Sequence, residues 1–152
     1  MLFSALFFYG CAPKTTSGVM PLRKGNVTGN WVLNNITYEG IAESAVKTLF
    51  TDASPRCFLG SSWSLTNSGN GAYSLPGGTD CTQKTQTIYW SVSIPDETFQ
   101  FKRLNAGEKA KDVTEGYRLI LAAADGQTLT LKSPVEVSGG AAYIVLHFAK
   151  AQ

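Results

Sequence analysis

Strict alternation of apolar and polar residues over short runs is the feature that most limits how this chain can fold. Residues 62–67 (SWSLTN) alternate in this way, and residues 72–75 (AYSL) follow the sequence SGNG at 68–71. A period of two places the apolar side chains on one face of a β-strand, and glycine and asparagine accept the backbone angles of a tight turn. The two runs are therefore predicted to pair as a β-hairpin.

The same pattern recurs along the chain between turn residues. Further strands are predicted over residues 30–38, 86–94, 99–103, 117–122, 129–131 and 142–148. Val46, Leu49 and Phe50 lie at helical spacing, so one short helix is predicted within 42–50. No helical pattern alternates with the strands. The sequence therefore predicts an all-β antiparallel domain of about eight strands, closed as a barrel or folded as a sandwich.

Composition supports a single β domain and argues against one class of partner. The 152 residues suffice for one domain with its own core. Charged residues make up 16% and glycines number 15, which favours β structure over helix. The net charge is +2 and no cluster of lysine and arginine occurs, so nucleic acid is not expected as a partner.

The N-terminal residues resemble a targeting signal. Residues 2–9 are almost wholly apolar and precede Gly10 and Cys11. The run is too short to span a bilayer and is typical of a signal peptide. A small residue directly before a cysteine resembles the end of a bacterial lipobox. Residues 1–11 are therefore predicted to be a signal peptide with lipidation at Cys11, and residues 12–25 a flexible tether. The alternative is a cleaved signal peptide with an incidental cysteine.

Three cysteines are present, and lipidation of Cys11 leaves Cys57 and Cys81 as a pair. An exported protein enters an oxidising compartment, so a disulfide between them is predicted. The competing interpretation is a metal site, which would need further ligands. His147 is the only histidine and lies far along the chain.

Several short motifs together resemble a known family. Residues 29–31 (GNW) resemble the Gly-x-Trp signature of lipocalins. Residues 57–63 (CFLGSSW), followed by Asn67 and by 71–73 (GAY), resemble the pattern of small bacterial lipocalin-like lipoproteins. The resemblance assigns residues 26–152 to a lipocalin-like barrel of eight strands that can hold a small apolar molecule.

The resemblance also implies roles for particular residues. Trp31 is expected at the closed end of the barrel, against the side chain of Arg118 or Lys150, in a structural role. An eight-stranded barrel is just wide enough to be filled by side chains or to hold one small ligand. The residues expected to line such a site, by alternation or as orienting polar groups, are Trp63, Asn67, Tyr73, Trp90, Phe99, Phe101, Arg103 and Tyr117.

No catalytic arrangement is apparent. His147 has no partner for a triad or a metal, and Ser64 lacks the context of a nucleophile elbow. The carboxylates near 96–97 and 108–115 lie in predicted turns and loops, where acidic residues are expected because water solvates them. We therefore expect neither an enzyme nor a bound cofactor or metal.

Two functional hypotheses remain. The first is a binding protein of the bacterial cell envelope, exported and tethered to a membrane by its lipid, that holds a small apolar ligand in the barrel. The second is a structural or accessory lipoprotein with a packed barrel and a protein partner that the sequence does not identify. A void among the aromatic residues would favour the first hypothesis, whereas a packed interior with an exposed apolar patch outside the barrel would favour the second.

Overall fold

The computed structural model describes residue 10 and residues 21–152 of the chain. The predicted lipidation site at Cys11, the apolar run 2–9 and most of the predicted tether lie outside the described residues.

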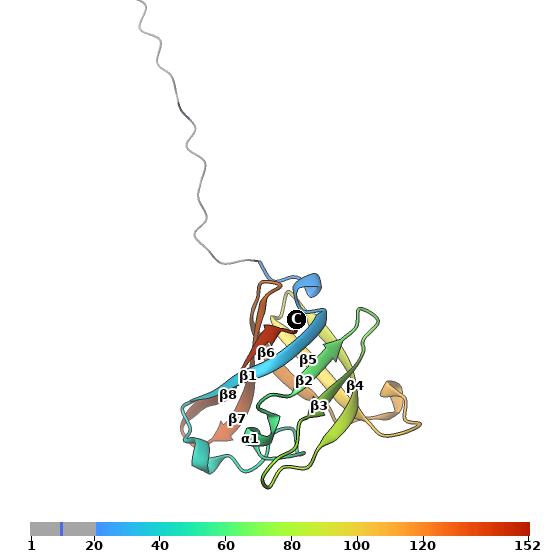
Figure 1. Cartoon of the computed structure of the whole chain (residues 1–152). Helices are drawn as coiled ribbons and strands as arrows, with labels where there is room; N and C mark the ends of the chain where they lie inside the picture. Colours follow the sequence, from blue (N-terminus) through green and yellow to red (C-terminus); the bar gives the residue numbers. More distant parts are fainter. Residues whose placement is uncertain (1–9, 11–20) are drawn as a thin grey trace, which may run out of the picture.

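Eight antiparallel strands form one closed barrel (Figure 1). Each strand pairs with the next along the chain, and the last pairs with the first. The strands are β1 (Gly29–Glu39), β2 (Ser62–Leu65), β3 (Asn70–Leu75), β4 (Lys84–Ser93), β5 (Thr98–Leu104), β6 (Tyr117–Ala124), β7 (Thr128–Val137) and β8 (Gly140–Lys150). The predicted all-β antiparallel barrel is confirmed, and the barrel form is favoured over the sandwich.

The turns explain why neighbouring strands pair in this order. The hairpin between β2 and β3 turns at Gly69, whose φ is +98°, and the hairpin between β6 and β7 turns at Gly126, whose φ is +89°. Glycine adopts these left-handed angles without steric cost. A side chain at residue 69 would also collide with the ring of Tyr89, 2.9 Å from the position of a Cβ atom. The predicted hairpin is thus present, with its strands at 62–65 and 70–75.

The short helix lies elsewhere than predicted. Residues 42–50 contain only the single 3-10 turn η2 (Glu43–Ala45), and Phe50 has a left-handed φ of +56°. The α-helix is α1 (Pro55–Phe58). Pro55 is its first residue, and proline is favoured in the first turn of a helix. The helical spacing of the apolar residues in 42–50 was misleading, because these side chains turn into the barrel from an irregular segment.

Aromatic side chains fill the barrel interior. The ring of Trp63 is buried, with its centroid 4.7 Å from that of Tyr73 and 5.8 Å from that of Phe101. Phe148 of β8, on the other side of β1, lies 5.6 Å away. These distances are those of rings in direct contact. The interior is therefore a packed core, which by itself favours the packed-barrel hypothesis, and a ligand site within it requires that one of these rings move out.

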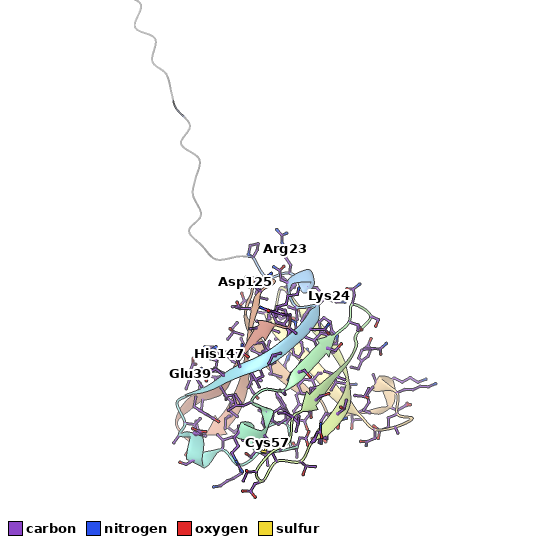
Figure 2. All side chains as sticks on the ribbon, in the orientation of Figure 1. Arg23, Lys24, Glu39, Cys57, Asp125 and His147 are labelled. Carbon is purple, nitrogen blue, oxygen red and sulfur yellow. A yellow bond between two sulfur atoms is a disulfide. The ribbon has the colours of Figure 1, made fainter. Side chains whose placement is uncertain are left out.

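The two ends of the barrel differ. The 3-10 turn η1 (Lys24–Asn26) caps one end, where the Trp31 indole donates a hydrogen bond to the Val27 carbonyl at 2.8 Å. Lys150 lies over the Trp31 ring at 5.9 Å, so Lys150 and not Arg118 has the expected position. Figure 2 shows Arg23 and Lys24 at this end and Cys57, in α1, at the other. We call the end that carries α1 the mouth.

Candidate functional site

The mouth is closed by a segment that contributes no strand to the barrel. We call residues 41–54, between β1 and α1, the plug. Phe50 of the plug is 5% exposed. Its ring lies 4.8 Å from that of Phe101 and 5.4 Å from that of Tyr117, both nearly edge-on. It also contacts Phe58 and Trp63 at 5.6 and 6.1 Å. The plug thus places one phenyl ring among the inward-facing aromatic side chains.

The backbone of the plug is strained, and in the part of the chain that the structure describes its hydrogen bonds reach no further than the adjoining helix α1. Phe50 and Thr51 have φ angles of +56° and +52°, a region that costs residues with a side chain on the order of 1–3 kcal/mol each. Among the described residues, the backbone hydrogen bonds of 41–54 join only positions within 42–57, such as Leu49 N–H to the Ala53 carbonyl at 2.8 Å. No plug backbone group bonds a strand. Side chains therefore hold the plug in the mouth.

The strongest of these side-chain attachments is Asp52. Its carboxylate is 6% exposed and accepts a hydrogen bond from the Tyr73 hydroxyl at 2.5 Å. Lys84 of β4 donates a hydrogen bond to the same carboxylate, and a guanidinium nitrogen of Arg103 of β5 lies 3.7 Å from it. The hydroxyls of Thr51 and Tyr117 also form a hydrogen bond with each other at 3.2 Å. Three groups from the barrel wall therefore converge on one buried carboxylate of the plug.

This arrangement shifts the pKa values of several of its ionisable groups, among them Asp52 and Tyr73. Burial by itself would raise the pKa of Asp52, but the hydrogen bonds from Lys84 and Tyr73 and the nearby positive charges outweigh it, so that pKa is lowered. Burial and the hydrogen bond to Asp52 strongly raise the pKa of Tyr73. The carboxylate is therefore ionised and the phenol neutral at physiological pH.

A groove runs beside the plug. Its volume is about 740 Å³, and it separates the plug from β7 and β8. Its apolar lining includes Val46, Leu49 and Phe50 of the plug and Pro134, Val135 and Ile144 of the wall. The groove therefore extends along the plug as far as Phe50, which is one of its lining residues.

The structure brings most of the predicted ligand-binding residues together. Trp63, Tyr73, Trp90, Phe99 and Phe101 are buried in one cluster, and Arg103 and Tyr117 lie at the mouth. Asn67 does not join them, because β2 ends at Leu65. Asn67 is exposed in the following turn, where its carbonyl accepts a hydrogen bond from Lys24 at 3.0 Å. Its predicted place in the interior was wrong.

Sequence reasoning missed the two plug residues that matter most at the mouth. Phe50 was assigned to a helix, and Asp52 was not singled out. The only local signal is an apolar pair followed by an acidic residue, Leu-Phe-Thr-Asp at 49–52, between Gly40 and Pro55. That pattern has no strand or helix period, so periodicity could not identify it.

A second groove, of about 600 Å³, lies on the outer face of β4, β5 and β6. Lys102, Lys111 and Arg118 line it together with Tyr89, which is 40% exposed, and no carboxylate contributes to its lining. Among the described residues none of these three cations forms an ion pair.

The predicted disulfide is present between Cys57 and Cys81, whose Cα atoms are 5.4 Å apart. It joins α1 to the connection between β3 and β4 and so fixes the end of the plug. His147 accepts or donates one hydrogen bond, to Thr37 at 2.8 Å. Among the described residues, no three histidine, cysteine or acidic side chains gather as a metal site would require. No helix in the same part of the chain is long and apolar enough to cross a membrane.

Comparison of the chain with models of protein families and with curated proteins returns no match. The fold and the mouth define a closed eight-stranded antiparallel barrel plugged by its own loop.

Proposed function

We propose that this chain is an exported lipocalin-like protein, tethered by a lipid on Cys11, that binds a small apolar ligand at the barrel mouth. The observation that carries the proposal is the position of Phe50. A single ring from a strained loop occupies the space among Phe101, Tyr117 and Trp63. A ligand of similar size and polarity would make the same contacts if the plug moved out.

The energetics of the plug support this proposal. Strained backbone persists where the surrounding structure enforces it, and such strain is concentrated at ligand clamps and switch segments. The plug has no backbone hydrogen bond to a strand among the described residues, and a groove already separates it from β7 and β8. Segments of this kind open locally at a lower free-energy cost than the core. The Cys57–Cys81 disulfide is compatible with an oxidising compartment outside the cytoplasm.

A titration with a neutral environment-sensitive probe, N-phenyl-1-naphthylamine, tests the proposal. Energy transfer from the buried tryptophans would report a probe bound at the mouth. We expect saturable binding that strengthens in Phe50→Ala, which vacates the site, and weakens in Val135→Trp, which fills the groove. Lys109→Ala, in an exposed loop, serves as the matched control and should bind like the wild type.

Absence of saturable binding in a folded Phe50→Ala protein would overturn this function. The chain would then be a packed barrel acting as an accessory or interaction lipoprotein. The outer groove favours that alternative, because Lys102, Lys111 and Arg118 form a cationic surface without a carboxylate in its lining. Variants with all three changed to alanine would then be compared with the wild type for capture of acidic peptides.

A further inference from the structure

The plug presents to the barrel two chemical groups in a fixed order. Phe50 supplies a phenyl ring and Asp52, two residues later, supplies a carboxylate. The ring is surrounded by aromatic side chains of the interior. The carboxylate is held at the rim, within reach of Lys84 and Arg103. The plug therefore offers the barrel an apolar body that ends in an acid.

All groups that receive the carboxylate belong to the wall and not to the plug. Tyr73 lies on β3, Lys84 on β4 and Arg103 on β5, and the paired strands fix their spacing. When the plug leaves, two cations and one phenol hydroxyl remain at the rim of an aromatic cavity. Cationic and hydroxyl donors that converge on one point form charge-assisted hydrogen bonds to a carboxylate, which are about twice as strong as neutral ones.

Other acidic residues lie nearby, but among the described residues none of them forms an ion pair with Lys84 or Arg103. Glu108, Asp112 and Glu115 line a polar recess of about 620 Å³ beside Lys84 and Arg103. The ion pairs of Lys84 and Arg103 within the described part of the chain are both to Asp52. Glu115 instead accepts a hydrogen bond from the Tyr117 hydroxyl at 3.2 Å. The donors at the rim are therefore directed to the carboxylate that accompanies Phe50.

We propose that the ligand is a small amphiphilic carboxylate with an aromatic or aliphatic body, and that Phe50 and Asp52 act as its internal competitor. This inference rests on the proposed function, since it specifies the ligand of the same site. The plug and the ligand exclude each other, so the apparent affinity is the intrinsic affinity reduced by the fraction of molecules whose plug is open. Weakening the plug should therefore tighten ligand binding without any change in the receiving groups.

A pair of matched ligands tests the charge requirement. 4-Phenylbutyrate and 4-phenylbutanol share one skeleton and differ in the terminal group, and calorimetric titration measures both against the purified protein. We expect the carboxylate to bind at least about tenfold more tightly than the alcohol, as one charge-assisted hydrogen bond predicts. Arg103→Met should remove most of that preference. Arg118→Met, which removes an exposed cation from the outer face of β6, is the control and should keep it.

Asp52→Asn tests the competition. It leaves Tyr73, Lys84 and Arg103 in place and removes the charge of the internal competitor, so we expect it to bind 4-phenylbutyrate about tenfold more tightly than the wild type. Circular dichroism and thermal unfolding of each variant establish that it is folded.

The outcomes separate the two proposals. Equal affinities for the acid and the alcohol, with binding strengthened by Phe50→Ala, would overturn the inference and leave the proposed function standing. Weaker binding of the acid by Asp52→Asn than by the wild type would overturn the competitor role. No binding of either ligand, nor of the neutral naphthylamine probe, by folded Phe50→Ala would overturn the proposed function as well.

Discussion

Asp52 is a buried carboxylate whose partners all come from other elements. Carboxylates are rarely buried without a partner, and this one has Lys84, Arg103 and the hydroxyl of Tyr73 around it. The two cations remain partly exposed, with side chains 34% and 27% accessible. Removal of the carboxylate therefore leaves charges that water can still solvate, which limits the loss of stability.

Asp52→Asn should lower the free energy of unfolding at pH 7 by about 1–3 kcal/mol, the cost of disrupting a hydrogen-bonded buried charge. Because the pKa of Asp52 is lowered in the folded protein, its contribution is fully present above the unfolded-state pKa of about 3.9 and is lost as the pH falls through the folded-state pKa. Urea unfolding of both proteins between pH 7 and 3 measures this.

The difference in stability between the wild type and Asp52→Asn should narrow as the pH falls below about 4. Asp125, whose pKa is also lowered by backbone hydrogen bonds of its own turn, is present in both proteins and cancels in the comparison. A difference that stays constant down to pH 3 would contradict the assignment of the ionised state to Asp52.

At the scale of the element, the plug and the strands differ in how they are held. The longest pairings are those of β8, which bonds β7 on one side and β1 on the other. The plug has side-chain attachments and hydrogen bonds within itself. Segments that are held by few contacts open locally at a lower free-energy cost than core strands.

Hydrogen exchange at pH 7 should therefore show the amides of Leu49 and Asp52 exchanging much faster than those of β7 and β8, although both amides are hydrogen bonded. Mass spectrometry of peptides covering 41–54 measures this, with peptides of β8 as the internal reference. Equal protection of the two regions would mean that the plug opens only with the whole barrel.

The disulfide constrains the element that follows the plug. Cys57 and Cys81 are separated by 24 positions, and closing a loop of this length stabilises a protein by about 3 kcal/mol. The double variant Cys57→Ala/Cys81→Ala should lose roughly this amount in denaturant unfolding while keeping the circular dichroism of a β protein. A loss well below about 1 kcal/mol would contradict this prediction.

At the scale of the whole molecule, closure of the barrel joins distant parts of the chain. Trp31 pairs with Lys150 in the register of β1 and β8. Proteins dominated by such non-local pairing fold in milliseconds to seconds. Stopped-flow tryptophan fluorescence of the disulfide-intact protein should show its main refolding phase in that range, and a main phase in microseconds would contradict it.

The barrel itself was predictable because its strands are half-buried, so period-two alternation records which side faces the core. The hairpin at 62–75 and the strand around Trp90 follow directly from it. The mouth was not predictable, because Phe50 and Asp52 act from an irregular segment whose conformation depends on the cavity it fills. A carboxylate outside a regular pattern appears in sequence as a solvated surface group, and only tertiary structure brings Lys84 and Arg103 to it.

The end of the barrel at which the chain enters determines where the proposed lipid anchor is attached relative to the mouth. The described chain enters at Pro21, beside η1, at the end where Arg23 and Lys24 lie and away from α1 and the plug (Figures 1 and 2). The proposed lipid on Cys11 would therefore be attached through the end of the barrel opposite the mouth, so the tether would not lie across the plug. Under the proposed function, a ligand would enter and leave at the mouth without displacing the tether.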